Sequence, residues 1–163
     1  MRIALATALT LTLSTLALSA QGHQGAMGVW VLNTQQSKFD PGPLPKVQTS
    51  TFTLLPGGAV KIENDSTDAQ GRTSHREMVS KFDGRQEERS GSGQPTSRAY
   101  RWVDDLNFEF EELINGQRSV VGRTSMSQDG NVRTLTVNGT RNGMPVHNVE
   151  VYERQRPGGS PRR

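Results

Sequence analysis

The chain contains no cysteine. This absence excludes a disulfide framework and any metal site built on thiolates. Beyond residue 20 there is no long apolar run, and only about a quarter of the residues are apolar, which is low for a globular domain. A parallel sheet buried on both faces needs nearly continuous runs of valine, isoleucine and leucine. The sequence therefore favours an antiparallel sheet with one face exposed to solvent and the other packed on a single thin core.

The one long apolar run lies at the start of the chain. It extends from Ile3 to Leu18 after the basic Arg2, and it ends on the small residues Ser19 and Ala20. Such a run is too short for a stable membrane span and has the form of a cleavable leader. We expect a signal peptide over residues 1–20, cleavage after Ala20, a periplasmic or secreted product and no membrane span after cleavage. An uncleaved N-terminal anchor is the alternative.

The basic character of the chain is concentrated at its C-terminal end. The net charge is +3 and the isoelectric point about 9.7, yet residues 21–153 hold 14 basic and 16 acidic side chains. A nucleic-acid-binding face requires clustered arginine and lysine on the folded domain, so we expect no nucleic-acid partner. Residues 21–27 and 156–163 lack apolar periodicity, which predicts a flexible N-terminal segment and a disordered basic tail.

Turn signals divide the chain between residues 28 and 155. Asn-Gly and Asp-Gly pairs reach positive φ at low cost and are typical of tight β-hairpins. Between the turns, apolar and polar residues alternate with the period of a strand, and no segment of comparable length shows a helical period. About nine strands are predicted, with a weak tenth at 86–90, over residues 28–33, 47–55, 59–66, 73–82, 97–104, 106–114, 118–127, 132–140 and 145–154.

Consecutive hairpins predict the fold class. We expect an all-β, antiparallel up-and-down meander of about 8 to 10 strands, closed into a small barrel over residues 28–155. A β-sandwich is the alternative, although it needs longer crossover connections. The proline-rich segment Phe39–Lys46 lacks ladder donors, so it is expected to form an extended cover or a crossover.

No known catalytic motif or metal-binding pattern is present. Three histidines are too few and too scattered for a zinc site, and no metal or cofactor is expected; they are His23, His75 and His147. A group of acidic residues resembles a glycosidase pair only superficially, because alternation with Phe108 and Phe110 indicates a solvated strand face; its members are Asp104, Asp105, Glu109, Glu111 and Glu112. We therefore expect that the protein is not an enzyme.

Two motifs carry a resemblance to a known fold family. Gly28-Val29-Trp30 resembles the opening strand of lipocalin-type barrels, and the strand ending at Arg154 resembles the closing strand of fatty-acid-binding proteins. Over residues 28–155 the chain is similar to a family of small bacterial exported proteins with a calycin-type, lipocalin-like pattern. The resemblance implies that Gly28, Trp30 and Arg154 close one end of the barrel, with Arg154 stacked on a buried Trp30.

The last strand also suggests ligand-binding residues. Fatty-acid-binding proteins hold the ligand carboxylate with an Arg-x-Tyr pair on this strand; Tyr152 matches the tyrosine, and Glu150 stands at the arginine position. If both face inward, Glu150 repels carboxylates, which favours neutral or cationic amphipathic ligands. If the strand instead turns Val149 and Val151 inward, Tyr152 is a structural residue at the rim.

Three functions follow from these observations. The leading hypothesis is an exported protein that holds one apolar or amphipathic small molecule in the barrel cavity. The alternative is a non-enzymatic envelope or secreted interaction protein with a filled barrel. An enzyme of another type comes third. The sequence does not indicate an oligomeric state.

Overall fold

The computed structural model describes residues 23–91 and 93–156. The predicted signal peptide, and all of the predicted basic tail except Arg156, lie outside the described residues. Ten strands follow a single turn of 3-10 helix, η1 (Gln24–Ala26). They are β1 (Gly28–Leu32), β2 (Val47–Leu54), β3 (Val60–Thr67), β4 (Thr73–Ser80), β5 (Asp83–Glu88), β6 (Thr96–Trp102), β7 (Asn107–Ile114), β8 (Gln117–Met126), β9 (Val132–Arg141) and β10 (Met144–Arg154).

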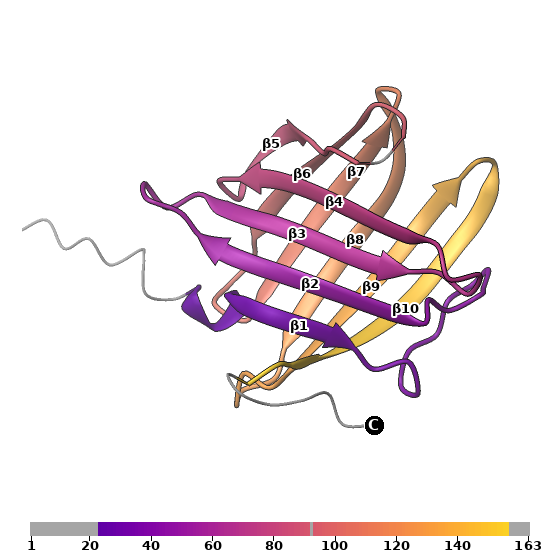
Figure 1. Ribbon diagram of the computed structural model, residues 1–163. Coiled ribbons are helices and arrows are strands. Elements are labelled where there is room, and N and C mark those ends of the chain that lie inside the picture. Colours follow the sequence, from indigo (N-terminus) through magenta and orange to yellow (C-terminus); the bar gives the residue numbers. More distant parts are fainter. Residues whose placement is uncertain (1–22, 92, 157–163) are drawn as a thin grey trace, which may run out of the picture.

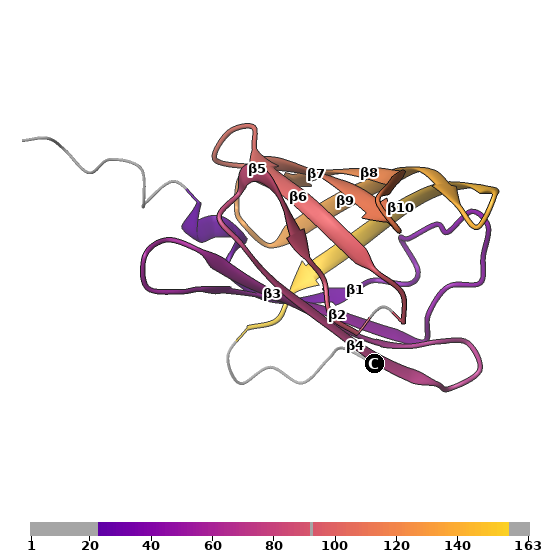
Figure 2. The same ribbon diagram turned by 90° about the horizontal axis from the view of Figure 1, so that it is seen from above.

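The strands form one antiparallel meander that closes on itself almost completely. Their order in the sheet is β4-β3-β2-β1-β10-β9-β8-β7-β6-β5, so the first and last strands of the chain pair with each other. Figure 1 shows the strands wrapping around a common interior, and Figure 2 shows the two walls from above. The predicted up-and-down barrel is confirmed, and the β-sandwich alternative is excluded.

The Asn-Gly pairs make the tight turns that the sequence predicts. Asn115 and Gly116 both have positive φ, at 51° and 75°, and join β7 to β8. Asn142 and Gly143 do the same between β9 and β10, at 50° and 77°. Two successive positive φ values match the right-handed twist of the flanking strands.

The strand predictions agree with the structure to within a few residues, except at β5. The sequence indicated a weak strand over 86–90, whereas β5 occupies Asp83–Glu88. Five of its six residues are exposed, so its sequence lacks the alternation that locates the other strands.

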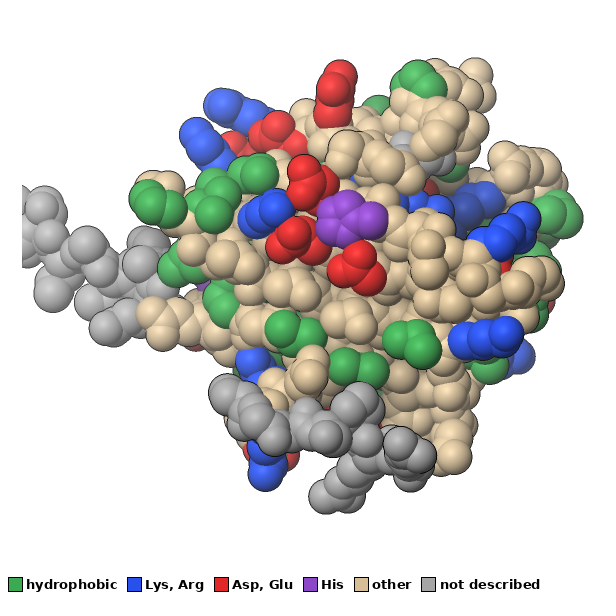
Figure 3. Space-filling view, viewed as in Figure 1, with side chains coloured by type: hydrophobic (Ala, Val, Ile, Leu, Met, Phe, Trp, Pro, Cys, Tyr) green, Lys and Arg blue, Asp and Glu red, His purple; other side chains and the backbone are tan. Residues whose placement is uncertain are grey.

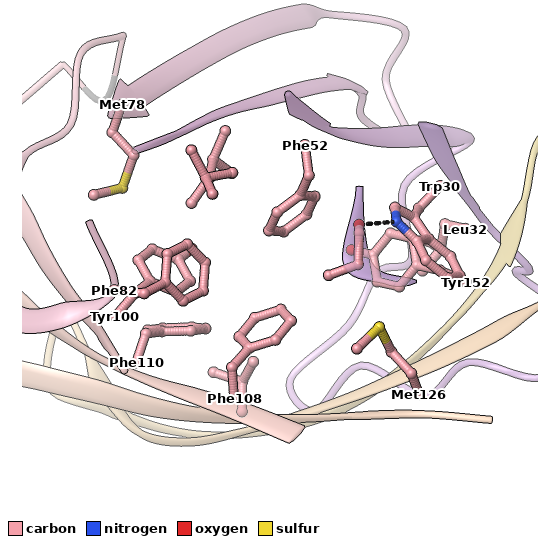
Figure 4. Packing of buried hydrophobic residues seen from close by; sticks show 14 of the residues in the cluster. Trp30, Leu32, Phe52, Met78, Phe82, Tyr100, Phe108, Phe110, Met126 and Tyr152 are labelled. Carbon is pink, nitrogen blue, oxygen red and sulfur yellow. Dashed lines mark hydrogen bonds between the residues drawn. The ribbon is translucent and has the colours of Figure 1, made fainter. Parts of the chain in front are cut away.

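The barrel has a sealed end and a mouth end. Successive connections of a meander lie at alternate ends: residues 55–59, 103–106 and 127–131 at the sealed end, and 68–72, 89–95, 115–116 and 142–143 at the mouth end. Trp30, Leu32 and Tyr152 pack together on one side of the interior, and Phe82, Tyr100 and Phe110 on another (Figure 4).

The segment before β1 is packed, which corrects the expectation of a flexible segment at 21–27. Over its described part, residues 23–27, Ala26 is buried and its carbonyl accepts a hydrogen bond from Trp30 Nε1 at 2.9 Å (Figure 4). The His23 ring stacks on Trp102 with centroids 4.0 Å apart. The segment is polar in sequence, but its backbone carbonyls serve as acceptors for side chains of the barrel.

The proline-rich loop between β1 and β2 runs beside β10. Lys38 and Val149 exchange two backbone hydrogen bonds of 2.8 Å, and the amide of His147 donates to the Asp40 carbonyl at 2.6 Å. Phe39 is thereby placed on the cavity wall. The loop is thus an extended cover, one of the two roles expected for it. None of the described helical segments is long and apolar enough to cross a membrane.

Candidate ligand cavity

The barrel encloses a cavity of about 290 Å³ that reaches from the Trp30 side to the mouth end. This volume is at the lower limit of known small-molecule pockets, roughly 300 to 1,000 Å³. Its wall combines aromatic side chains with an unusual number of charged ones. The charged residues are Arg76, Arg89, Arg98, Arg133, Arg141, Glu112 and Glu150.

Arg133 supplies a buried cation near the sealed end. It is the second residue of β9 and only 3% exposed. Its guanidinium carbon lies 4.3 Å from the Tyr152 ring centroid, 4.9 Å from that of Phe52 and 5.3 Å from that of Trp30. Among the described residues, no carboxylate lies within ion-pair distance of it and its Nε has no hydrogen-bond partner. Burial lowers the pKa of Arg133.

Glu150 and Tyr152 both face the cavity, so Val149 and Val151 do not. Glu150 Oε2 accepts a hydrogen bond of 2.6 Å from the Tyr152 hydroxyl and one of 3.2 Å from Gln48 Nε2. Burial and the neighbouring Glu150 raise the pKa of Tyr152, which keeps the hydroxyl protonated as a donor. The carboxylate of Glu150 is therefore satisfied by neutral donors, whereas the Arg133 guanidinium is not.

A cluster of four arginines surrounds one carboxylate at the mouth end. Glu112 is 2% exposed, and it accepts bonds of 2.7 Å from Arg98 Nε and 3.0 Å from Arg141 Nη2. Arg89 Nη1 lies 3.5 Å from the same carboxylate. Burial raises the pKa of Glu112, but Arg98 and Arg141 outweigh that effect and lower it to about 2. Glu112 is therefore ionised at neutral pH and remains paired with Arg98 and Arg141.

Arg76 is the fourth arginine of this mouth cluster. It is half-buried, and its buried Nε has no hydrogen-bond partner among the described residues. Burial lowers the pKa of Arg76, and the positive charges of Arg98 and Arg141 lower it further. Arg76 is therefore a cation without a counter-charge of its own.

The position of Glu112 corrects the sequence analysis, which placed it on a solvated face. Glu112 lies two and four residues beyond Phe110 and Phe108, and all three share the inward face of β7. Glu109 and Glu111, on the opposite face, contact Arg101 and Arg118 outside the barrel. The sequence analysis also missed the buried arginines. Arg98 lies on the same strand face as Tyr100, and Arg133 on the same face as Val137, so the alternation of each strand could have placed both arginines in the interior.

Gly28, Trp30 and Arg154 close the sealed end. Trp30 is fully buried, and the Arg154 guanidinium lies 4.3 Å over its ring. Arg154 also donates to the carbonyls of Gly130, at 2.6 Å, and Met27, at 2.5 Å. Gly28 has φ +114°, and a Cβ there would stand 3.0 Å from Arg154 Nη1, so the glycine admits the stacked arginine.

The histidines lie outside the cavity. His23 packs at the sealed end, His147 contacts Asn138 on the outer surface, and His75 belongs to a charged group on the outer face of β3 and β4 (Figure 3). Donor atoms of Glu63, His75 and Glu77 lie within 4.8 Å of one another. Lys61 Nζ already contacts the two carboxylates, at 2.8 and 3.0 Å, so this surface group contains its own cation.

His75 is expected to titrate above the usual range for histidine. Its Nδ1 lies 2.7 Å from Asp65, and this hydrogen bond is the main cause of the raised pKa, with Glu77 contributing. A raised pKa in the folded state stabilises the fold below the unfolded-state value of about 6.5, and the contribution disappears as the pH rises through the folded-state pKa. An NMR titration should show a lower His75 pKa in Asp65→Asn. An unchanged value in that variant would contradict the assignment.

An outer groove of about 620 Å³ follows the seam where the barrel is not fully closed. It lies between β4 and β5, which among the described residues are joined by a single bridge, from Glu77 to Ser90. Arg89, Gln94 and Thr96 line both this groove and the inner cavity. These three residues therefore form the wall between the interior and the outside.

The ten meander strands form a nearly closed antiparallel barrel around a polar, cationic cavity. The crystal structure of a mutant of the fluorescent protein UnaG has this fold: it matches with a TM-score of 0.56 at 9% identity, covering 82% of this chain and 99% of that one. The siderocalin Ex-FABP, described as functioning through dual ligand specificities, matches with a TM-score of 0.37 at 11% identity over 84% and 78%. No protein-family model and no curated protein sequence matches the chain.

Proposed function

We propose that this protein is an exported carrier that binds a small anionic amphipathic molecule inside the barrel. The observation that carries the proposal is Arg133, a buried cation on the cavity wall. No carboxylate lies at ion-pair distance from it among the described residues, and Glu150 acts on it only from farther away. A charge in this position is costly unless it is paired, and a ligand carboxylate would supply the missing partner. Export is proposed from the leader-like residues 1–20.

The charge of the whole wall revises the ligand preference inferred from the last strand. Glu150 alone favours neutral or cationic ligands, but five arginines face two glutamates across the cavity. The Glu150 carboxylate also already accepts hydrogen bonds from Tyr152 and Gln48. The position that holds an arginine in fatty-acid-binding proteins holds a glutamate here, and Arg133 on the neighbouring strand β9 supplies the cation instead.

Binding without catalysis is the function proposed for the cavity. Glu112 has a pKa of about 2, so it has no proton to donate at neutral pH, and the arginines hold it in place. The cavity also distinguishes the proposal from the alternative of a filled interaction barrel, because that alternative assigns no role to an unpaired cation in the interior.

Removal of the Arg133 charge tests the proposal. Wild-type protein should bind dodecanoate about tenfold or more tightly than dodecanol, because charge-assisted hydrogen bonds contribute roughly 1.5 to 3 kcal/mol. Arg133→Met should abolish this preference while it retains the apolar contacts. Isothermal titration calorimetry measures both ligands, and Arg123→Met, which removes an exposed arginine, is the matched control.

Two results would contradict the proposal: equal affinity of the wild type for the acid and the alcohol, or an unchanged preference in a folded Arg133→Met variant. Circular dichroism establishes folding in each case. The variant is expected to fold, because replacing an unpaired buried charge by an apolar side chain removes a desolvation cost.

A further inference from the structure

Two arginines on the cavity wall combine a buried Nε that lacks a hydrogen-bond partner with the absence of a carboxylate at ion-pair distance, among the described residues. They are Arg133 and Arg76. Buried polar groups are normally satisfied by protein or by a bound molecule. The cavity therefore offers two separate positions for an anionic group.

The two positions lie at opposite ends of the barrel. Arg133 follows the 127–131 connection at the sealed end, whereas Arg76 belongs to the cluster around Glu112 and Arg141, next to the 142–143 turn at the mouth end. Arg133 and Arg141 themselves stand near the two ends of β9, about 26 Å apart along the strand at roughly 3.3 Å per residue. Because Arg76 interacts with Arg141 and Glu112 and not with the groups around Arg133, we expect one carboxylate to occupy only one of the two positions.

The electrostatic surroundings of the two positions are also distinct. The neighbours that shift the pKa of Arg76 are Arg98, Arg141 and Glu112. The neighbours that shift the pKa of Arg133 are instead Tyr152, Tyr100, Glu150 and Arg154. Of these, Tyr100 also accepts a hydrogen bond of 3.1 Å from Arg98. The two sets share no member.

The wall that holds these two arginines also carries aromatic and apolar side chains, among polar ones such as Ser50, Asn64 and Thr124. Phe52, Phe108, Phe110, Leu135 and Val137 line it together with Tyr100. An elongated apolar body fits this surface, whereas a compact dianion would leave it uncovered.

The mouth cluster has an excess of positive charge that only a second anion balances. Three arginines, Arg89, Arg98 and Arg141, contact the single carboxylate of Glu112, whose oxygens are occupied by Arg98 and Arg141. Arg76 faces the cavity beside them without sharing in these bonds.

We propose that the ligand is an elongated apolar molecule with an anionic group at each end, one held by Arg133 and the other by Arg76. This inference rests on the proposed function and specifies its ligand class. It predicts that α,ω-dicarboxylates bind better than monocarboxylates of the same length.

Calorimetric titration with matched acids tests the inference. Hexadecanedioic and dodecanedioic acid are compared with hexadecanoic and dodecanoic acid, against wild type, Arg76→Met, Arg133→Met and the control Arg123→Met. For at least one length the diacid should bind wild type about tenfold or more tightly than its monoacid. Arg76→Met should remove this advantage and leave the monoacid affinity unchanged, whereas Arg133→Met should weaken both ligands.

Carbon-13 labels on both carboxyl groups supply a second readout. A symmetrical diacid bound at two different positions should give two bound carboxyl resonances, one shifted by Arg76→Met and the other by Arg133→Met. Equal diacid and monoacid affinities with an effect of Arg133→Met on both would overturn the two-ended ligand and leave the anion carrier intact. Absence of any Arg133-dependent acid binding in folded protein would overturn the proposed function itself.

Discussion

Replacing Trp30 with alanine should lower the free energy of unfolding by about 3 to 5 kcal/mol. Trp30 is fully buried, its Nε1 donates to the Ala26 carbonyl at 2.9 Å, and its ring lies beneath Arg154 at 4.3 Å. Truncation would leave a cavity at the sealed end and remove the surface on which Arg154 stacks. Urea unfolding followed by circular dichroism measures the loss independently of tryptophan fluorescence.

Two further variants separate burial from polar contacts. Trp30→Phe retains a ring and loses the bond to Ala26, so it should cost less than the alanine variant but at least the 0.5 to 1.5 kcal/mol, roughly, that is typical of one hydrogen bond. Trp102→Ala removes a partly exposed tryptophan and should also cost less than Trp30→Ala. A loss below about 1 kcal/mol for Trp30→Ala would show that Trp30 does not seal the barrel.

Replacing Glu112 with glutamine should also be strongly destabilising, by about 3 to 5 kcal/mol, although the shape of the side chain is retained. The substitution leaves Arg98, Arg141 and Arg89 facing one another around a neutral amide. Glu111→Gln is the matched control, because Glu111 is the preceding residue on the outer face and contacts only the exposed Arg118 among the described residues. An exposed ion pair contributes at most about 1 kcal/mol. Similar losses in the two variants would contradict the role of Glu112.

The stabilisation by Glu112 should depend on pH in a defined way. Its pKa in the fold, about 2, is lower than the unfolded-state value of about 4.3. The contribution is therefore complete above the unfolded-state pKa and disappears as the pH falls toward 2. The difference in unfolding free energy between wild type and Glu112→Gln should shrink over this range.

The barrel was predictable because its local signals agree with one another. Asn115-Gly116 and Asn142-Gly143 mark hairpins whose backbone requires positive φ at both residues, and the alternation between the turns locates the strands. At β5 these signals fail, since a strand with almost no buried residue leaves no periodic pattern.

The cavity was predictable only in part. Tyr152 and Glu150 were indicated by the closing-strand resemblance, but the arginines were not, because charged residues in alternating strands are normally assigned to the solvent face. Arg133 lies two residues before Leu135, so both side chains point to the same side of β9. The alternation along the strand could therefore have indicated that Arg133 faces the interior. Arg98 and Arg141 both contact Glu112, although the three residues belong to β6, β9 and β7. The pattern within one strand does not predict such contacts between strands.

The seam between β4 and β5 gives the barrel a weak line. Every other neighbouring pair of strands is joined by a ladder of backbone hydrogen bonds, whereas this pair meets at one bridge, between Glu77 and Ser90, within the described residues. Local opening costs least where the fewest bonds must separate. Because Arg89 and Thr96 line both sides of this wall, parting β5 from β4 connects the interior with solvent while the sealed end around Trp30 stays intact. Widening along this side would therefore open the interior to solvent without unfolding the rest of the barrel.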